Sequence, residues 1–289
     1  MPRKQNLTAL FFVAPFVIAY LVIFIYPTLQ MAQLSLTDAP LIGDGKWVGF
    51  KNYIRLWNDA QLWRSALNTG YFVLLTVIPT TIVGLMLALM VNRLNGWFQS
   101  IILACFFLPY ILPVSVVILV WQWLLDTQFG VAQGLIKLFT GKTVSVFRDR
   151  YWAMPMVALI TIWWTNGFNL LLFIAGLRNI SQDYYDAAAL DGAGRWQQFR
   201  YITLPLLWPV TALVLTIQLI LQLKIFDQVY LLTQGGPANA TYVMVQYIYK
   251  QAFQLNKGGY AATVALALFA FIVILSVLQY QVLRSRGQK

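Results

Sequence analysis

The sequence predicts an all-α polytopic protein that crosses a membrane six times. Three observations favour this fold class: 60% of the 289 residues are hydrophobic, only 10% are charged, and the apolar residues gather into long runs. A transmembrane helix needs about 20 apolar residues, because each residue rises only about 1.5 Å and every backbone polar group must bond within the helix. Since soluble domains carry about a quarter charged residues, most of this chain is expected inside a bilayer.

Apolar runs of sufficient length occupy residues 7–30, 66–91, 99–124, 152–176, 204–224 and 260–283. The first run follows Arg3 and Lys4, as a secretory signal would. Its apolar part, from Leu7 to Pro27, exceeds the roughly 7–15 residues of a cleavable signal core, so we expect a retained helix. Residues 1–289 are expected to form a single transmembrane domain, and an even number of spans puts both termini on one side of the membrane.

The composition argues against an enzyme. The chain has no His and no Glu, and its nine acidic residues are Asp scattered over loops and helix ends. The chain therefore lacks most of the residues from which an acid–base pair, a His-centred triad or a zinc site is built. We expect no metal or cofactor bound by this chain. Gly141, Lys142 and Thr143 resemble the end of a phosphate-binding loop, but Ile136 stands where that motif needs its first Gly.

The net charge of +11 does not call for a nucleic-acid partner. The cations are spread along loops and helix ends, where they suit the headgroups of membrane lipid. Lys and Arg alone give no clear orientation: the outer segments hold more of them, while the shorter inner segments hold them at higher density.

A polar loop at 177–203 separates the fourth and fifth apolar runs. Asp183, Asp186 and the alanines at 187–189 favour a short helix, and Gly192 permits a sharp turn. Residues 195–201 can form a second short helix, after which Leu204 and Pro205 are expected to open the fifth membrane helix. Composition alone also allows an ordinary amphipathic helix on the membrane surface.

Residues 186–205, DAAALDGAGRWQQFRYITLP, resemble the EAA loop of ABC importer permeases, with matches at Asp186, Ala187, Ala188, Gly192, Ile202, Leu204 and Pro205. The family's leading Glu is Asp here, a carboxylate one methylene shorter. In that family the loop is the cytoplasmic coupling helix by which an ATPase drives the membrane subunit. The resemblance therefore implies a set of ATPase-coupling residues: Asp186, Ala187, Ala188, Asp191, Gly192, Ala193, Arg195, Phe199, Leu204 and Pro205.

Other segments resemble the carbohydrate-uptake branch, which includes the maltose and glycerol-3-phosphate permeases. They are VGFKNYIRLWND at 48–59, FFLPYILPVSVVILVWQWLLD at 106–126, FDQVYLLTQGGPANAT at 226–241, YKQAF at 249–253 and GYAAT at 259–263. The resemblance implies a type I importer fold in a bacterial inner membrane. It also implies as partners a second homologous permease, two ATPase subunits that hold ATP and Mg²⁺, and an extracytoplasmic solute-binding protein. Because the 177–203 loop would face the ATPase, both termini are expected in the cytoplasm.

Polar groups inside the apolar runs are candidates for a solute path, since they are costly in lipid and normally face a cavity or another helix. Aromatic faces and amides suit a sugar, and the candidates are Trp163, Trp164, Thr165, Asn166, Asn169, Gln218, Gln222, Lys224 and Asp227. The amides have a second interpretation as hydrogen bonds between helices. Lys224 has three interpretations: it extends to the headgroups, pairs with Asp227 or contacts an anionic solute.

These features together predict the permease subunit of an ATP-driven, binding-protein-dependent importer for a sugar or sugar derivative, forming half of a translocation path. The alternative is an ion-coupled secondary carrier of a small polar solute. That class would need carboxylates at the centre of the spans or an inverted repeat, and the six runs have neither in evident form.

Overall fold

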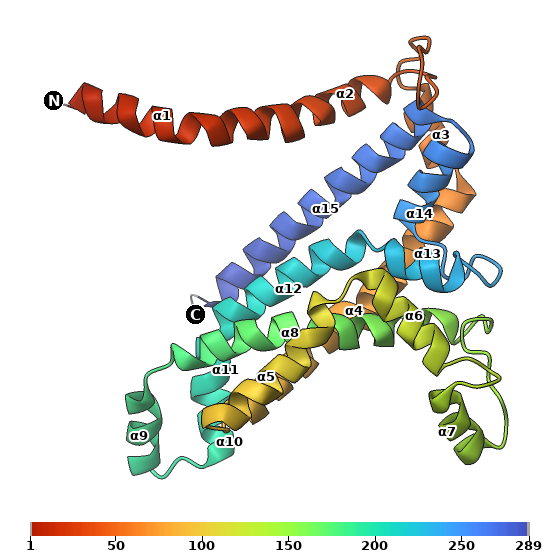
Figure 1. The fold of residues 1–289 in the computed structure, drawn as a ribbon. Coiled ribbons are helices and arrows are strands. Elements are labelled where there is room, and N and C mark those ends of the chain that lie inside the picture. The colour runs from red at the N-terminus through yellow and green to blue at the C-terminus, as the bar shows by residue number, and fades with distance from the viewer. Residues whose placement is uncertain (1, 288–289) are drawn as a thin grey trace. The chain divides into compact units, whose positions relative to one another are not determined.

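The protein is almost entirely helical. The computed structural model describes residues 2–287, and within them there is no β-strand, only an isolated bridge between Thr37 and Trp47 (Figure 1). The all-α fold class is therefore confirmed. In chain order the helices are α1 (Pro2–Tyr20), α2 (Tyr26–Leu34), α3 (Lys51–Trp57), α4 (Ala60–Val91), α5 (Gly96–Ile111), α6 (Val114–Leu124), α7 (Val131–Thr140), α8 (Ala153–Arg178), α9 (Gln182–Leu190), α10 (Arg195–Gln198), α11 (Leu204–Leu206), α12 (Trp208–Leu223), α13 (Asp227–Thr233), α14 (Met244–Tyr249) and α15 (Gly258–Gly287).

Among residues 2–287, four segments are long and apolar enough to cross a membrane, and the number rises to six if each of two bent helix pairs is one span. The four are Phe11–Leu34, Ala60–Val91, Ala153–Arg178 and Gly258–Leu283. Each overlaps one of the apolar runs at 7–30, 66–91, 152–176 and 260–283. In the first, α1 and α2 are joined by a π-helical segment, η1 (Leu21–Ile25), without a break in the helix.

The structure corrects the expectation of one continuous helix over 99–124. Here α5 and α6 meet at an angle of 100°. Leu112 lies between them in an extended conformation, with φ −67° and ψ 138°, and is followed by Pro113. A residue before proline is driven out of the helical region by its contact with the proline ring, which accounts for the break.

The fifth run is also broken, and its membrane helix begins later than expected. Leu204 and Pro205 lie in α11, which continues from α10 through a second π-helical segment, η2 (Phe199–Thr203). A bend of 61° then separates Arg195–Leu206 from Trp208–Leu223. Pro209 has no N–H to donate to the Pro205 carbonyl, so the helix cannot continue unbroken through Leu207.

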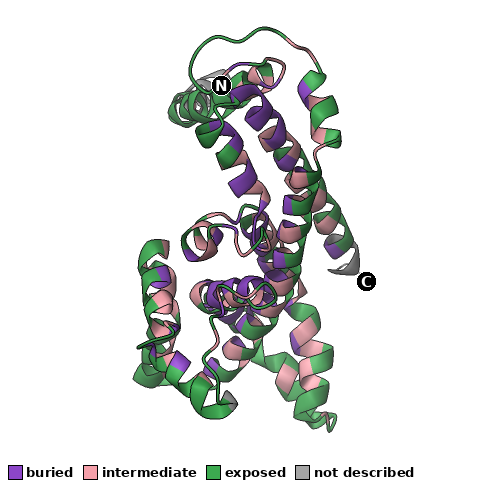
Figure 2. Cartoon of the chain, turned by 90° about the vertical axis from the view of Figure 1, so that its right-hand side faces the viewer, coloured by how far each residue is buried: buried purple, intermediate pink, exposed green. Residues whose placement is uncertain are grey.

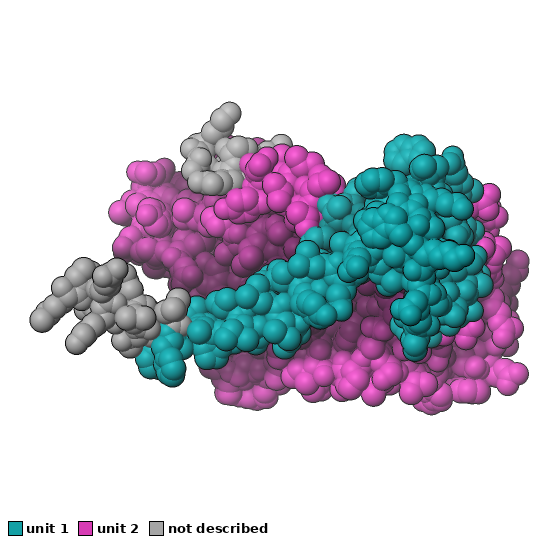
Figure 3. Space-filling model, turned by 90° about the horizontal axis from the view of Figure 1, so that it is seen from above, with its two compact units in different colours: residues 1–62, 247–271 teal, residues 63–246, 272–289 magenta. Residues whose placement is uncertain are grey.

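Close contacts divide the chain into two compact units: residues 1–62 with 247–271, and residues 63–246 with 272–289 (Figure 3). In the first unit, the segment after α2 is tied to the start of α15. Asn52 donates to the Ser35 and Thr37 carbonyls at 2.9 and 2.7 Å, and Thr263 donates to the Ser35 carbonyl at 3.1 Å. The N–H of Gly259 donates to the Ala39 carbonyl at 2.9 Å.

The second unit holds two apolar clusters that place α8 among its neighbours. One cluster includes Phe72, Val157 and Val229, and the other includes Phe173 and Val214. A Cβ on Gly167 of α8 would lie 2.3 Å from the Phe106 carbonyl oxygen of α5, so this helix pair packs at backbone contact. Exposed residues occur along most of the helices (Figure 2). Many of them are large and apolar, as expected of surfaces that contact lipid or partner subunits.

Candidate functional site

The polar loop at 177–203, called here the coupling loop, folds into the two short helices that the sequence predicts. Ser181 caps α9 by accepting from the Asp183 N–H at 3.2 Å. The helix closes with the Ala193 N–H donating to the Ala188 carbonyl at 2.8 Å. Gly192 has φ +79°, a left-handed conformation that favours glycine, and it redirects the chain toward α10.

Most of the ATPase-coupling candidates in this loop are exposed. Asp186, Ala187, Asp191, Gly192 and Arg195 are exposed, whereas Ala188, Ala193 and Phe199 are half-buried. Asp186 accepts a hydrogen bond from Gln182 at 3.1 Å, within its own helix. Large apolar side chains are exposed as well: Leu190 is 90% exposed and Trp196 is 70% exposed.

The last two coupling candidates, Leu204 and Pro205, lie outside the loop itself. They lie in α11, the short helix before the bend, with Leu204 half-buried and Pro205 exposed.

Two hydrogen bonds hold the coupling loop together, and sequence reasoning missed both. The Tyr185 hydroxyl lies 3.0 Å from the Thr203 hydroxyl, which in turn donates to the Gln198 carbonyl at 3.4 Å. Tyr185 is on α9 and Thr203 is the last residue of η2, so the first bond joins the two helices of the loop, whereas the second lies within the α10–η2 segment. Tyr and Thr are too common in loops for their pairing to be read from the sequence.

Three of the solute-path candidates form a buried chain of amides between α8 and α12. Gln218 donates to the Asn169 side-chain oxygen at 2.9 Å, and Gln222 donates to the Gln218 side-chain oxygen at 2.9 Å. All three are buried, with exposures of 0% for Asn169, 1% for Gln218 and 3% for Gln222. We call them the amide ladder. Their geometry is that of the packing alternative, a hydrogen bond between helices, and contact with a solute stays a prediction.

Asn166 and Thr165 flank this ladder on α8. A Cβ on Gly84 of α4 would lie 2.8 Å from the Asn169 Cβ and 3.0 Å from the Asn166 Oδ1 atom, so α4 covers this face closely. Asn166 Oδ1 and Asn169 Nδ2 are buried without a partner among the described residues. The Thr165 hydroxyl donates to the Thr161 carbonyl of its own helix at 2.8 Å.

The two tryptophans of α8 have different surroundings. Trp163 is 43% exposed and meets Trp121 edge to face, with ring centroids 5.5 Å apart. Trp164 donates its indole N–H to the Leu112 carbonyl at 3.3 Å, at the break between α5 and α6. Trp164 therefore stabilises the break between α5 and α6, while Trp163 has an exposed aromatic surface that a ligand or a partner can contact.

Lys224 and Asp227 lie where α12 ends and α13 begins, and both side chains are exposed. The structure thus brings together Asn169, Gln218 and Gln222, places Asn166 beside them, and leaves Trp163, Lys224 and Asp227 at exposed positions of the same unit.

A polar cluster that the sequence did not reveal lies in the first unit. Asp59 accepts hydrogen bonds from the Tyr247 hydroxyl and, at 2.7 Å, from the Tyr260 hydroxyl. Its other oxygen accepts from the backbone N–H groups of Gln61 and Leu62 at 3.0 and 3.1 Å, the geometry of an N-cap for α4. We call Asp59, Tyr247 and Tyr260 the tyrosine clamp.

Two members of the clamp, Asp59 and Tyr247, lie outside the membrane spans, and the clamp shifts the pKa of each. Partial burial by itself would raise the pKa of Asp59. The hydrogen bonds from both tyrosines and from the Leu62 and Gln61 N–H groups outweigh it, so the pKa of Asp59 lies below its usual value. Burial and the hydrogen bond to Asp59 raise the pKa of the Tyr247 hydroxyl. At neutral pH the clamp therefore holds the Asp59 carboxylate against a protonated Tyr247.

Residues 80–287 match the family model described as "Binding-protein-dependent transport system inner membrane component". The chain belongs to this family. Membership confirms the expectation of an inner-membrane permease component rather than an enzyme.

Two curated relatives match nearly the whole chain. The sulfoquinovosyl glycerol transport system permease protein SmoG of Agrobacterium fabrum is 30% identical, over 98% of this chain and 92% of its own length. The lactose transport system permease protein LacF of Rhizobium radiobacter is 31% identical, over 99% and 97%.

A solved structure supports the fold. A chain of a bacterial ABC transporter involved in the import of the acidic polysaccharide alginate matches with a TM-score of 0.86 and 22% identity, over 98% of this chain and 96% of that one. The ABC importer permease fold is therefore confirmed.

Proposed function

We propose that this permease imports a sugar or sugar derivative and forms half of a translocation path together with a second, homologous permease. The support comes from its relatives: SmoG and LacF are named as permeases for sulfoquinovosyl glycerol and lactose, and each spans almost the full chain. A third relative, 30% identical over 92% of this chain, is the arabinooligosaccharides permease AraP of Bacillus subtilis. Permeases named for sugars of quite different size and charge thus match this chain over most of its length.

The observation that carries the coupling part of the proposal is the exposed coupling loop. A loop between two membrane spans gains nothing from exposing Leu190 to water, because burying large apolar side chains is favourable. An unpartnered apolar surface beside the Asp186 carboxylate suits a groove on another protein. We assign this surface to a cytoplasmic ATPase, which puts both termini of the chain in the cytoplasm.

In this proposal the chain binds no cofactor itself. Two ATPase subunits hold ATP and Mg²⁺, and an extracytoplasmic binding protein delivers the solute. A solved neighbour is described as an alginate ABC transporter in complex with a pentasaccharide-bound periplasmic protein, which supports the last of these partners. Closure of the ATPase pair would move the coupling loop, and α11 and α12 would carry that motion into the membrane as alternating access.

The test compares two glycines with the same backbone problem. Gly192 in the coupling loop has φ +79° and Gly141 after α7 has φ +71°, and a Cβ would meet no atom within 4 Å at either. A Trp at each position therefore pays a similar conformational cost. We expect Gly192→Trp to abolish solute-stimulated ATP hydrolysis and co-purification of the ATPase, while Gly141→Trp retains co-purification.

The complex is purified after co-expression with its candidate partners, and ATP hydrolysis is measured with binding protein across a panel of sugars, polyols and their phosphate or sulfonate esters. Stimulation by one solute would identify the substrate. Equal ATPase recovery with both variants would remove the coupling assignment. Failure of any ATPase to co-purify with the unmodified chain would favour the ion-coupled carrier instead.

A further inference from the structure

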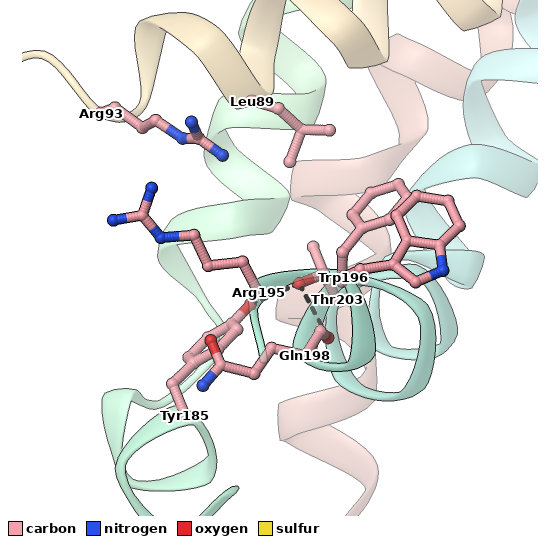
Figure 4. Close-up of a pocket in the computed structure, with 8 residues that line it drawn as sticks. Leu89, Arg93, Tyr185, Arg195, Trp196, Gln198 and Thr203 are labelled. Carbon is pink, nitrogen blue, oxygen red and sulfur yellow. Dashed lines mark hydrogen bonds between the residues drawn. The ribbon is translucent and has the colours of Figure 1, made fainter. Parts of the chain in front are cut away.

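A second feature of the coupling loop is a pocket of about 670 Å³ that it shares with the end of α4. The pocket lies within the second unit, and Leu89 and Arg93 line it from the α4 end. The coupling loop lines the rest, through Tyr185, Arg195, Trp196, Gln198, Phe199 and Thr203 (Figure 4). Because α4 is long and apolar enough to span a membrane and ends at Val91, we place the pocket near the level at which hydrocarbon gives way to headgroups.

The pocket concentrates positive charge without an acidic partner. Figure 4 shows the guanidinium groups of Arg93 and Arg195 on the same side of the pocket, directed toward one another. None of the lining residues is acidic. The nearby carboxylates of Asp183 and Asp186 accept hydrogen bonds from Ser181 and Gln182. Two like charges that converge on one space repel each other, and an anion between them removes that cost.

The opposite wall is apolar and aromatic. Figure 4 places the indole of Trp196 on the side away from the arginines, and its ring centroid lies 5.5 Å from that of Phe199. Leu89 adds an aliphatic surface. An apolar wall offers no favourable contact to a free phosphate ion. It can contact a lipid, because the charged headgroup of a lipid is joined to an apolar tail at this depth of the bilayer.

We propose that this pocket binds an anionic phospholipid. Arg93 and Arg195 hold the headgroup phosphate, for which the forked guanidinium group is suited, and Trp196, Phe199 and Leu89 contact the glycerol region and the first methylenes. Arg93 follows the α4 span and Arg195 begins α10, so a phosphate that bridges them fastens the coupling loop to the end of α4. The proposal requires only that α4 spans the membrane and does not depend on the solute or the ATPase.

The test is native mass spectrometry of the full-length chain in detergent, with phosphatidylglycerol and phosphatidylcholine of identical acyl chains. We expect phosphatidylglycerol to bind at least about tenfold more tightly, since each cation near an anionic lipid surface contributes substantially. The double variant Arg93→Gln/Arg195→Gln should lose that preference. The matched control is Arg64→Gln/Arg150→Gln, which removes the same charge from two other exposed arginines and should keep it.

Each remaining outcome overturns the proposal. Equal binding of the two lipids, or an unchanged preference in Arg93→Gln/Arg195→Gln, would show that the pocket is not the lipid site. Displacement of phosphatidylglycerol by equimolar inorganic phosphate would show a simple anion site. If the double variant keeps its lipid preference but, when co-expressed with the ATPase, no longer co-purifies with it, the arginines belong to the ATPase interface.

Discussion

The amide ladder and the tyrosine clamp solve the same problem by different means. Both join helices through polar side chains, but the ladder consists of buried, neutral amides on α8 and α12, inside membrane spans. The clamp is built on a carboxylate, Asp59, which directly precedes the span that begins at Ala60. The ladder is neutral and the clamp is charged because a charged side chain is costly inside lipid.

A carboxylate at the centre of a span would cost several kcal/mol, whereas an amide can be satisfied by another amide at a modest cost. One step before the start of α4, Asp59 is favoured by the positive end of the helix dipole and by four hydrogen-bond donors. The comparison predicts that the clamp contributes more to stability than the ladder does.

The largest effect is expected from Asp59→Ala. This change removes an N-cap, worth about 1 kcal/mol, and takes the carboxylate acceptor away from two tyrosine hydroxyls whose side chains are each 2% exposed. We expect a loss of about 2–4 kcal/mol, measured by unfolding of the purified chain in mixed detergent micelles.

The matched control for that change is Asp149→Ala. Asp149 accepts from the backbone N–H groups two and three residues ahead, Tyr151 and Trp152, at 2.8 and 3.1 Å, as Asp59 does, but it has no tyrosine clamp. Its loss should cost about 1 kcal/mol. Equal losses in the two variants would mean that the tyrosine hydroxyls add nothing and that Asp59 is only a cap.

The contrast also shows what sequence reasoning could reach. The membrane spans follow from apolar length, and Gln218 with Gln222 follow from a spacing of four on one helix, because both signals are local. Asn169, the partner of that pair, lies 49 residues from Gln218, and Asp59 lies 188 and 201 residues from its tyrosines. Pairings of that separation are decided by tertiary packing.

The helix breaks were missed for a different reason. Pro113 and Pro209 were visible in the sequence, but they lie in apolar runs whose total length fits one span, so a count of apolar residues alone makes each run continuous. Prolines within such runs are better treated as candidate bends from the start.

A smaller effect is expected from Gln218→Leu, in the middle of the ladder. It leaves the Asn169 oxygen and the Gln222 amide without their partners, at a position that is 1% exposed. Hydrogen bonds between membrane helices are worth up to about 1.7 kcal/mol, so we expect a loss of about 1–2 kcal/mol in the same unfolding measurement.

Gln222→Leu is the matched change at the end of the ladder. It breaks only one hydrogen bond, and we expect a loss of about 0.6 kcal/mol. A greater loss for Gln222 than for Gln218 would contradict the ladder. If instead both variants keep full stability but bind the solute more weakly, the amides belong to the solute path rather than to packing.

The smallest effect concerns the charge on the clamp. Because the folded state holds the pKa of Asp59 below its unfolded value, ionised Asp59 stabilises the fold above that unfolded value, about 3.9, and the contribution is lost as the pH falls through the folded pKa. Asp59→Asn keeps the shape of the side chain but does not titrate. Its stability should therefore depend less on pH than that of the unmodified chain as the pH falls from about 5 through the unfolded value and then the lower folded pKa, with the difference smaller than the loss in Asp59→Ala. Parallel curves for the two proteins would mean that the tyrosines hold the Asp59 side chain equally well without its charge, and the clamp would then resemble the ladder in kind.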